Sequence, residues 1–289
     1  MHTEENSLAK RTVSLLDRSG IRPSKARGQH FLVDANIVGK IISVAQVDKT
    51  DVVLEVGPGV GALTDALSEH AKAVVAVEFD HGLVALLKDY LDAPNIHLVS
   101  ADALEIGPAD LPQHSGSPNK MVSNLPYNIA APLLLNQLLS FPQISTFVVT
   151  VQAEIAERIT AQPGSKRYGS LTPKIQYLAS AKVVHNLSPN VFLPRPAVDS
   201  AIVKLTRHGR PPVAVESQKL LFAVVTAAFS TRRKTLRKSL TREFHDREAV
   251  TRAIDQAKID PMRRGESLAL PEFAELANRL SDNLGPGSF

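Results

Sequence analysis

Residues 52–62 read V-V-L-E-V-G-P-G-V-G-A, and this stretch constrains the fold more than any other part of the sequence. Its apolar run is typical of a strand that is buried on both faces, as in a parallel sheet. The glycines allow a tight turn, and the spacing of Leu63 and Leu67 predicts a helix directly after it. A helix that begins this way presents free N–H groups to a ligand. The sequence therefore predicts an α/β fold with a binding site at Gly57 and Gly59.

Three further apolar runs end in polar residues. The second run ends at Glu78, the third is followed by Asp102-Ala103, and the fourth ends at Asn124. Glu78 lies 21 residues after Gly57, where an acidic residue can bind both hydroxyls of a ribose. Asp102 can accept a hydrogen bond from an adenine amino group. Ligands of open α/β sheets bind at the carboxyl ends of the strands, so these residues are expected to line one cleft.

Each of these residues also has a simpler interpretation. Glu78 or Asp102 alone could cap a helix, and Glu55 could simply end a strand. The pattern G-x-G-x-x-A fits a dinucleotide fingerprint too, which leaves a nicotinamide cofactor and S-adenosylmethionine both open on this evidence. The coincidence of four successive strand ends favours a binding site, and it favours the methyl donor over the nicotinamide.

The tetrapeptide Asn124-Leu125-Pro126-Tyr127 suits chemistry on the exocyclic amine of a nucleobase. Such an amine is a poor nucleophile because its lone pair is delocalised into the ring. The Asn124 amide oxygen and the Leu125 carbonyl could accept its N–H bonds and favour the pyramidal nitrogen of the transition state. Pro126 fixes the backbone, and Tyr127 offers a face for a flipped-out base. Taken alone, the tetrapeptide would read as an ordinary turn at a strand end.

Composition excludes several classes of protein. The chain has 289 residues, of which 44% are hydrophobic, as expected for one sizeable core plus a smaller unit. It has no cysteine, which excludes disulfides, thiol catalysis and cysteine metal sites, and its nine histidines lack ligand spacing. No apolar run approaches the ~20 residues of a membrane span. We therefore expect a cytoplasmic protein with no metal, no membrane contact and no signal peptide.

Positive charge is concentrated at the C-terminal end. Residues 207–289 contain 15 basic and 10 acidic side chains, whereas the whole chain has 33 and 29. Residues 232–242 contain six basic side chains and no acidic one, and Leu236 and Leu240 can anchor one face of a helix there. A solvated face is the usual alternative, but such a face usually carries Glu at i,i+4. We therefore interpret it as a phosphate-binding helix that acts through Arg232, Arg233, Lys234, Arg237 and Lys238.

The chain divides into three predicted segments. Residues 1–28 form a basic N-terminal arm, in which Lys25 and Arg27 are candidate RNA contacts. Residues 29–206 alternate strands with helices, which predicts a mostly parallel sheet with helices on both faces. After a linker containing glycine and prolines, residues 216–284 form a small all-α domain, with helices predicted at 218–229, 231–241, 247–257 and 271–280.

In combination these features resemble the ribosomal RNA adenine N6,N6-dimethyltransferases, and the resemblance covers nearly the whole chain. The matching segments are 25–32, 55–59, Glu78, 102–103, 124–128, 152–154 with Arg158, 168–169, 192–200 and 229–236. The chain departs from the family in three places. His30 stands where Asn is more usual, Ala153 stands where Lys is common, and Lys238 replaces an Asn. None of the three lies in the tetrapeptide.

The resemblance implies a Rossmann-like class I S-adenosylmethionine-dependent methyltransferase domain with an antiparallel end strand. The donor would be held by a set of residues that share the strand ends and the arm. These are His30, Leu32, Glu55, Gly57, Gly59, Glu78, Asp102, Ala103 and Asn124. Tyr127 would stack on one face of the target adenine and Phe192 on the other, although Phe192 is equally interpretable as core.

The implied substrate is a pair of adjacent adenosines in the 3′-terminal hairpin loop of 16S rRNA, within the 30S ribosomal subunit. Each adenosine would receive two methyl groups at N6 from S-adenosylmethionine, in a role that belongs to small-subunit biogenesis. The expected protein is a monomer. Two alternatives stay open: a methylase of large-subunit ribosomal RNA, and a non-catalytic assembly or RNA-binding factor on the same fold.

Overall fold

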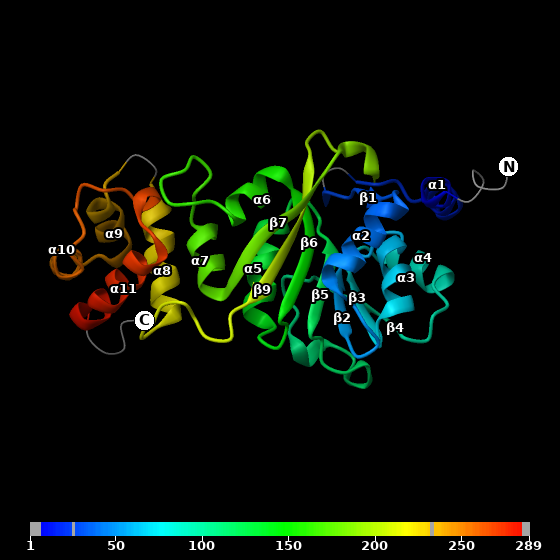
Figure 1. Cartoon of the computed structure of the whole chain (residues 1–289), viewed down its shortest axis with the longest axis horizontal. Helices are drawn as coiled ribbons and strands as arrows, with labels where there is room; N and C mark the ends of the chain where they lie inside the picture. Colours follow the sequence, from blue (N-terminus) through cyan, green and yellow to red (C-terminus); the bar gives the residue numbers. More distant parts are fainter. Residues whose placement is uncertain (1–6, 25–26, 232–233, 285–289) are drawn as a thin grey trace. The chain divides into compact units, whose positions relative to one another are not determined.

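The computed structural model describes residues 7–24, 27–231 and 234–284. The chain forms two compact units. Unit 1 contains the residues up to Ala156 together with Ala181–Arg207, and unit 2 contains Glu157–Ser180 together with the residues from His208 onward. The two units are described separately below (Figure 1).

A seven-stranded sheet forms the centre of unit 1, in the order β4-β3-β2-β5-β6-β9-β7. Its strands are β2 (Val52–Val56), β3 (Ala73–Glu78), β4 (Ile96–Ser100), β5 (Lys120–Asn124), β6 (Thr146–Gln152), β7 (Ala179–Leu187) and β9 (Ser200–Arg207). The pairs from β4 to β6 are parallel, and β9 pairs antiparallel with β6. The antiparallel strand is therefore second from the edge, where β7 lies, and not the end strand that the sequence suggested.

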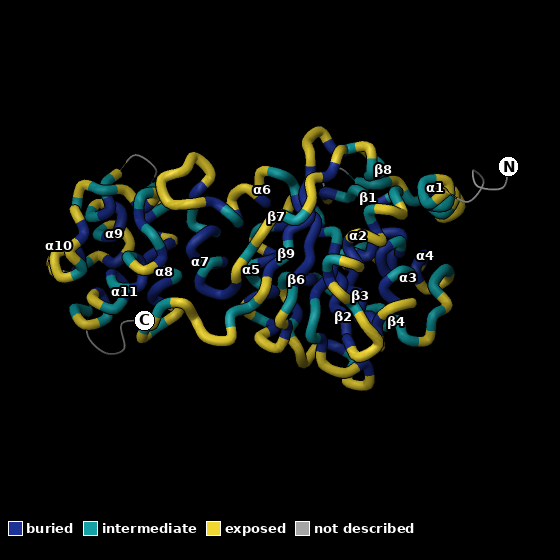
Figure 2. The backbone as a smooth tube through the Cα atoms, viewed as in Figure 1, coloured by how far each residue is buried: buried dark blue, intermediate teal, exposed yellow. Residues whose placement is uncertain are grey.

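Helices cover the sheet because its strands are apolar on both sides. Alternate strand residues such as Val53, Val122 and Ile202 join one core cluster with α2 (Ala35–Ala45) and α3 (Ala62–His70). Their neighbours, such as Leu54 and Met121, are equally buried and face a second layer. To that layer α5 (Ala130–Ser140) contributes the buried Leu133, Leu134 and Leu138. Figure 2 shows the inner strands as buried, whereas the edge strands β4 and β7 are largely intermediate or exposed.

The N-terminal arm packs on unit 1. Helix α1 (Leu8–Ser19) buries Leu16 in a small cluster with Phe31 and Leu83, the last from α4 (His81–Tyr90). Arg11 of α1 forms an ion pair with Asp65 of α3 at 2.6 Å. After the arm, β1 (Phe31–Leu32) pairs antiparallel with β8 (Phe192–Leu193) in a separate two-stranded sheet.

Unit 2 is helical. It contains α7 (Leu171–Leu178), α8 (Gln218–Phe229), α9 (Leu236–Phe244), α10 (Arg247–Gln256) and α11 (Leu270–Leu284), while α6 (Ala153–Ile159) runs from unit 1 into it. The Tyr168 hydroxyl donates to the Leu268 carbonyl at 2.8 Å, and its ring lies against Phe229, which in turn contacts Phe273. These contacts join the segment 157–180 to the C-terminal helices.

The α/β architecture with a separate helical unit, predicted from the sequence, is confirmed. Two boundaries differ from the sequence assignment. Residues 157–180 were assigned to the 29–206 domain but pack with unit 2, because Tyr168 and α7 face α8 and α11. Helix α9 begins at Leu236 rather than Thr231, because Thr235, at the N-cap position, has an extended backbone.

Candidate active site

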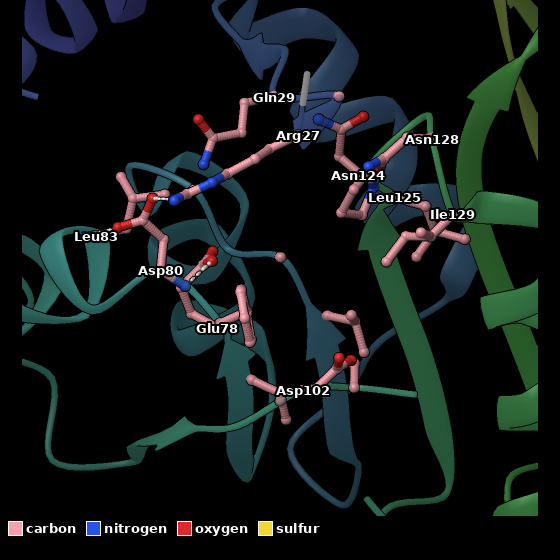
Figure 3. Close-up of a pocket in the computed structure, with 18 of the residues that line it drawn as sticks. Arg27, Gln29, Glu78, Asp80, Leu83, Asp102, Asn124, Leu125, Asn128 and Ile129 are labelled. Carbon is pink, nitrogen blue, oxygen red and sulfur yellow. Dashed lines mark hydrogen bonds and ion pairs between the residues drawn. The ribbon is translucent and has the colours of Figure 1, made fainter. Parts of the chain in front are cut away.

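The carboxyl ends of four neighbouring strands surround one cavity of about 260 Å³ (Figure 3). Asp102 follows β4, Glu78 ends β3, Gly57 follows β2 and Asn124 ends β5, and all four line the cavity. The volume is near the lower end of the ~300–1,000 Å³ range of small-molecule sites. The structure thus brings together the four residues that the sequence placed at successive strand ends.

The turn after β2 requires glycine at two positions. Gly57 and Gly59 have φ of 71° and 60°, which is left-handed backbone. A Cβ atom on Gly59 would lie 2.6 Å from Cδ1 of Phe31, so the turn and the arm pack without space for a side chain. This close approach makes one wall of the cavity from backbone atoms.

Two carboxylates also line the cavity. Glu78 is 8% exposed, accepts from the Asp80 N–H at 2.9 Å, and has its pKa raised chiefly by burial. The helix-cap alternative does not hold for Glu78, because Asp80 caps α4. Asp102 accepts from the Leu104 N–H at 2.9 Å through Oδ1 only. Both carboxylates therefore keep acceptor capacity for hydroxyl or amino groups.

Asn124 carries a buried acceptor that the protein does not use. Its Nδ2 donates to the His30 carbonyl at 2.7 Å, whereas its Oδ1 is buried and has no partner among the described residues. A buried polar atom without a partner is rare and calls for an explanation. Here the atom belongs to a residue that lines the cavity, so a ligand that carries an N–H group could satisfy it.

The two aromatic residues expected to hold the base do not line the cavity. Tyr127 is 9% exposed, its hydroxyl bonds to the Ser200 hydroxyl, and burial raises its pKa to about 12. Its ring lies 4.9 Å from that of His30 and 6.2 Å from that of Phe192. Phe192 is 1% exposed and belongs to the core cluster, in agreement with the core alternative for this residue.

The remaining cofactor candidates fall into two groups. Ala103 and His30 line the cavity. Leu32 and Glu55 lie instead beneath the glycine turn, around a much smaller void of about 20 Å³ that Asn124 also borders. Burial raises the pKa of Glu55 to about 8, and its Oε2 has no partner among the residues that the structure describes.

Several cavity residues were missed by the sequence reasoning. They are Gln29, Phe79, Asp80, Leu83 and Ile129. The acidic pair Glu78 and Asp80 around Phe79 was a signal, but nothing local marks Leu83 or Ile129. Arg27, predicted to bind RNA, lines the cavity and forms an ion pair with Asp80, which ties the arm to the start of α4 (Figure 3).

The other RNA-binding candidates belong to the C-terminal segment, apart from Lys25. Lys25, Arg232 and Arg233 lie outside the described residues. Lys234 and Lys238 are exposed and Arg237 is half-buried, and none of the three forms an ion pair with another described residue. They surround the start of α9, whose apolar side buries Leu236, Leu240 and Phe244.

No group of three or more His, Asp or Glu side chains is placed to hold a metal ion in the described part of the chain. No helix within the described ranges is long and apolar enough to cross a membrane.

The strand order, the antiparallel β9 and the cavity at the strand ends define a Rossmann-like class I methyltransferase domain, which uses S-adenosylmethionine. The site suits a nucleoside with a reactive amine beside it. Backbone atoms of the glycine turn form one wall, two carboxylates can accept from hydroxyl and amino groups, and Asn124 carries an oxygen that is unpartnered among the described residues. Solved structures of similar fold include a dimethyladenosine transferase from Plasmodium falciparum, with TM-score 0.71 and 26% identity, covering 86% of this chain and 96% of that one. Another is the 23S rRNA methyltransferase ErmE, with TM-score 0.63 and 29% identity, covering 86% and 99%.

The profile of the family described as ribosomal RNA adenine dimethylase matches residues 22–282, and the chain belongs to this family. The ribosomal RNA small subunit methyltransferase A of Streptococcus pneumoniae serotype 2 is 46% identical over 277 residues, 93% of this chain and 96% of that protein. The family and the S-adenosylmethionine-dependent adenine dimethyltransferase activity that the sequence resemblance implied are thus confirmed.

Proposed function

We propose that this enzyme dimethylates N6 of two adjacent adenosines in the 3′-terminal hairpin loop of 16S rRNA, in the cytoplasm and within the 30S subunit. The observation that carries the proposal is the buried Oδ1 of Asn124, a residue that lines the cavity, which has no partner among the described residues. The similarity to a small-subunit methyltransferase supports the choice of ribosomal RNA.

S-adenosylmethionine supplies an electrophilic methyl group when it is bound. Glu78 would hold the ribose hydroxyls and Asp102 the adenine amine of this donor. Asn124 Oδ1 and the Leu125 carbonyl would accept the two N–H bonds of the target amine, and so stabilise the pyramidal nitrogen more than the planar one. No base is needed before attack, because the methylated ammonium loses its proton readily.

The position of the target base differs from the one expected from the sequence. The Tyr127 hydroxyl is hydrogen-bonded to the Ser200 hydroxyl, and the His30 ring packs against the Tyr127 ring. Stacking of adenine on Tyr127 would require the His30 ring to shift, and stacking on Phe192 would require opening of the core around it. We therefore give Asn124 and Leu125 the main role in holding the base, and Tyr127 that of a fixed support behind them.

One alternative has structural support. The match to ErmE covers 99% of the ErmE chain with TM-score 0.63. A methylase of large-subunit RNA can therefore have the same fold as this chain. The cavity does not discriminate between the two RNAs, because it holds the donor and one base. Discrimination is expected to come from unit 2, where Lys234 and Lys238 are exposed and without ion pairs to other described residues.

The deciding experiment is transfer of labelled methyl groups to 30S subunits that lack the modification. Naked 16S rRNA and 50S subunits serve as parallel substrates, and the modified nucleoside is identified by mass spectrometry. We expect four methyl groups per 30S subunit, in N6,N6-dimethyladenosine. Transfer confined to 50S subunits would replace this proposal by the alternative, and binding of 30S without any transfer would indicate a non-catalytic factor.

A further inference from the structure

The segment 28–30, where the N-terminal arm ends, packs against the catalytic tetrapeptide through its backbone. The Gly28 carbonyl accepts from the Tyr127 N–H at 3.4 Å, and the His30 carbonyl accepts from Asn124 Nδ2 at 2.7 Å. Gly28 has φ of 66°, and a Cβ atom there would lie 2.8 Å from the backbone nitrogens of both Tyr127 and Asn128. The arm therefore contacts the tetrapeptide without space for a side chain at Gly28.

The bond from His30 decides which end of the Asn124 amide faces the cavity. The two ends of an amide have nearly the same size but opposite hydrogen-bonding roles. A backbone carbonyl can accept only from Nδ2, so the His30 carbonyl fixes the side chain with Oδ1 turned away from the arm. This bond is the only side-chain hydrogen bond of Asn124 among the described residues. Without it, either end of the amide could face the target amine.

The His30 side chain anchors this carbonyl. Its Nδ1 lies 2.7 Å from the Pro194 carbonyl oxygen, and because that oxygen only accepts, Nδ1 carries the hydrogen. The imidazole ring lies 4.9 Å from the Tyr127 ring, tilted by 33°. His30 is thus held on one side by the loop after β8 and on the other by the tetrapeptide itself.

We propose that His30 is a positioning residue: the bond from its ring to Pro194 holds its carbonyl against Asn124 Nδ2, and so presents Asn124 Oδ1 to the substrate amine. This inference rests on the proposed function. It means that His30 sets the orientation of the Asn124 side chain, which lies at the end of β5. An Asn at position 30 could replace the ring, because its amide nitrogen can also donate to the Pro194 carbonyl.

Two substitutions separate the two anchors of His30. His30→Asn keeps a donor for Pro194 and removes the ring, whereas His30→Phe keeps a ring against Tyr127 and removes the donor. We expect kcat of His30→Asn to stay within roughly threefold of the native value and kcat of His30→Phe to fall roughly tenfold or more, with the Kd of labelled S-adenosylmethionine changed less than kcat in both. Equal loss in the two variants, or a greater loss in His30→Asn, would overturn the proposal.

A second readout needs no RNA. In ¹⁵N-labelled protein the Asn124 side-chain NH₂ signals are identified by their disappearance in Asn124→Asp. We expect one of the two protons to exchange slowly with solvent in the native protein and in His30→Asn, and both to exchange fast in His30→Phe. Fast exchange in the native protein would contradict the proposal. Slow exchange combined with no methyl transfer to any RNA would overturn the proposed function but leave the positioning of Asn124 standing.

Discussion

At the scale of single residues, two of the candidate site residues carry a buried oxygen atom that lacks a partner among the described residues. The two atoms are Asn124 Oδ1 and Glu55 Oε2. The first belongs to a residue that lines the donor cavity. The second lies beneath the turn, where burial raises the pKa of the Glu55 carboxyl to about 8. The first atom is therefore expected to determine turnover, and the second to determine how stability varies with pH.

Asn124→Ala should reduce kcat roughly a hundredfold or more while the Kd of S-adenosylmethionine stays within about threefold, because the lost acceptor acts on the amine in the transition state. Single-turnover transfer to 30S subunits measures the effect. Asn136→Ala is the matched control, since Asn136 Nδ2 also donates to a carbonyl, that of Leu104 at 2.8 Å, but Asn136 does not line the cavity. Near-native turnover of Asn124→Ala would remove its catalytic assignment.

Glu78→Ala should weaken binding of S-adenosylmethionine roughly 10- to 100-fold, because hydrogen bonds to a charged group are worth about 1.5–3 kcal/mol. Titration with labelled donor measures this, and circular dichroism checks that the fold survives. Exposed Glu69 on α3 provides the control, Glu69→Ala, which should bind as the native chain does. An unchanged Kd in Glu78→Ala would contradict the role of this carboxylate.

The native protein should lose stability relative to Glu55→Gln as pH rises from about 4.5 to about 8. The folded protein holds the Glu55 proton across that window while the unfolded chain releases it, so each pH step costs folding free energy. One pKa unit represents ~1.4 kcal/mol, so a pKa raised from 4.5 to about 8 is expected to make a difference of a few kcal/mol, constant above pH 8. Urea unfolding at pH 5, 7 and 9 tests it; parallel curves for the two proteins would show that Glu55 is ionised at neutral pH.

At the scale of elements, helix α9 has one apolar face that is buried and another face whose basic side chains form no ion pair with other described residues. Lys234, Lys238 and Arg242 are four residues apart and exposed, and they form no ion pair with other described residues, whereas Arg252, Arg264 and Arg279 elsewhere in unit 2 all do. Lys238 and Arg242 lie along one side of α9, and Lys234 lies two residues before its first residue. Such a row is suited to a nucleic-acid backbone.

Replacing Lys234, Lys238 and Arg242 together by Ala should weaken binding to 30S subunits. It should also reduce the slope of log K against log salt concentration by ~0.7–0.9 for each lost phosphate contact. Cofactor binding should not change. The matched control replaces Arg252, Arg264 and Arg279, which are already paired. A slope equal to the native one in the first triple variant would mean that the row meets no phosphate.

Much of the site could be predicted because it depends on local order along the chain. The glycine turn, Glu78, Asp102 and Asn124 all follow from where apolar runs end. The orientation of Asn124 could not be predicted, because its partner His30 is 94 residues away. Nor could the burial of Tyr127, whose hydroxyl is held by Ser200, 73 residues further on. Pairing at such distances depends on the finished packing.

At the scale of the whole molecule, the units are discontinuous in sequence. Unit 2 includes Glu157–Ser180, which lies between two strands of the unit 1 sheet. A C-terminal fragment of residues 208–289 therefore lacks Tyr168 and α7, although it contains every helix that the sequence assigned to this domain. We expect it to be less stable, by roughly 2–3 kcal/mol or more, than a complete unit 2 in which a flexible linker replaces residues 181–207 and joins 157–180 to 208–289. This is the value of burying one large side chain.

Thermal and urea unfolding of the two fragments, followed by circular dichroism, test this expectation. The expected result is cooperative unfolding of the joined unit 2, with a weaker or absent transition in 208–289. Equal stability would show that the segment 157–180 contributes nothing to the helical unit.

The position of β9 between β6 and β7 has a consequence for how the protein is made. Both neighbours precede β9 in the chain, so a nascent polypeptide that has not reached residue 200 leaves β6 as an open edge and β7 without its partner in the sheet. Domains form from the N-terminus during synthesis, and unpaired strand edges favour aggregation. The edge of β6 therefore stays exposed until β9, which ends at Arg207, has been synthesised and is free to pair. We expect slower translation through residues 153–207 to lower the yield of folded enzyme.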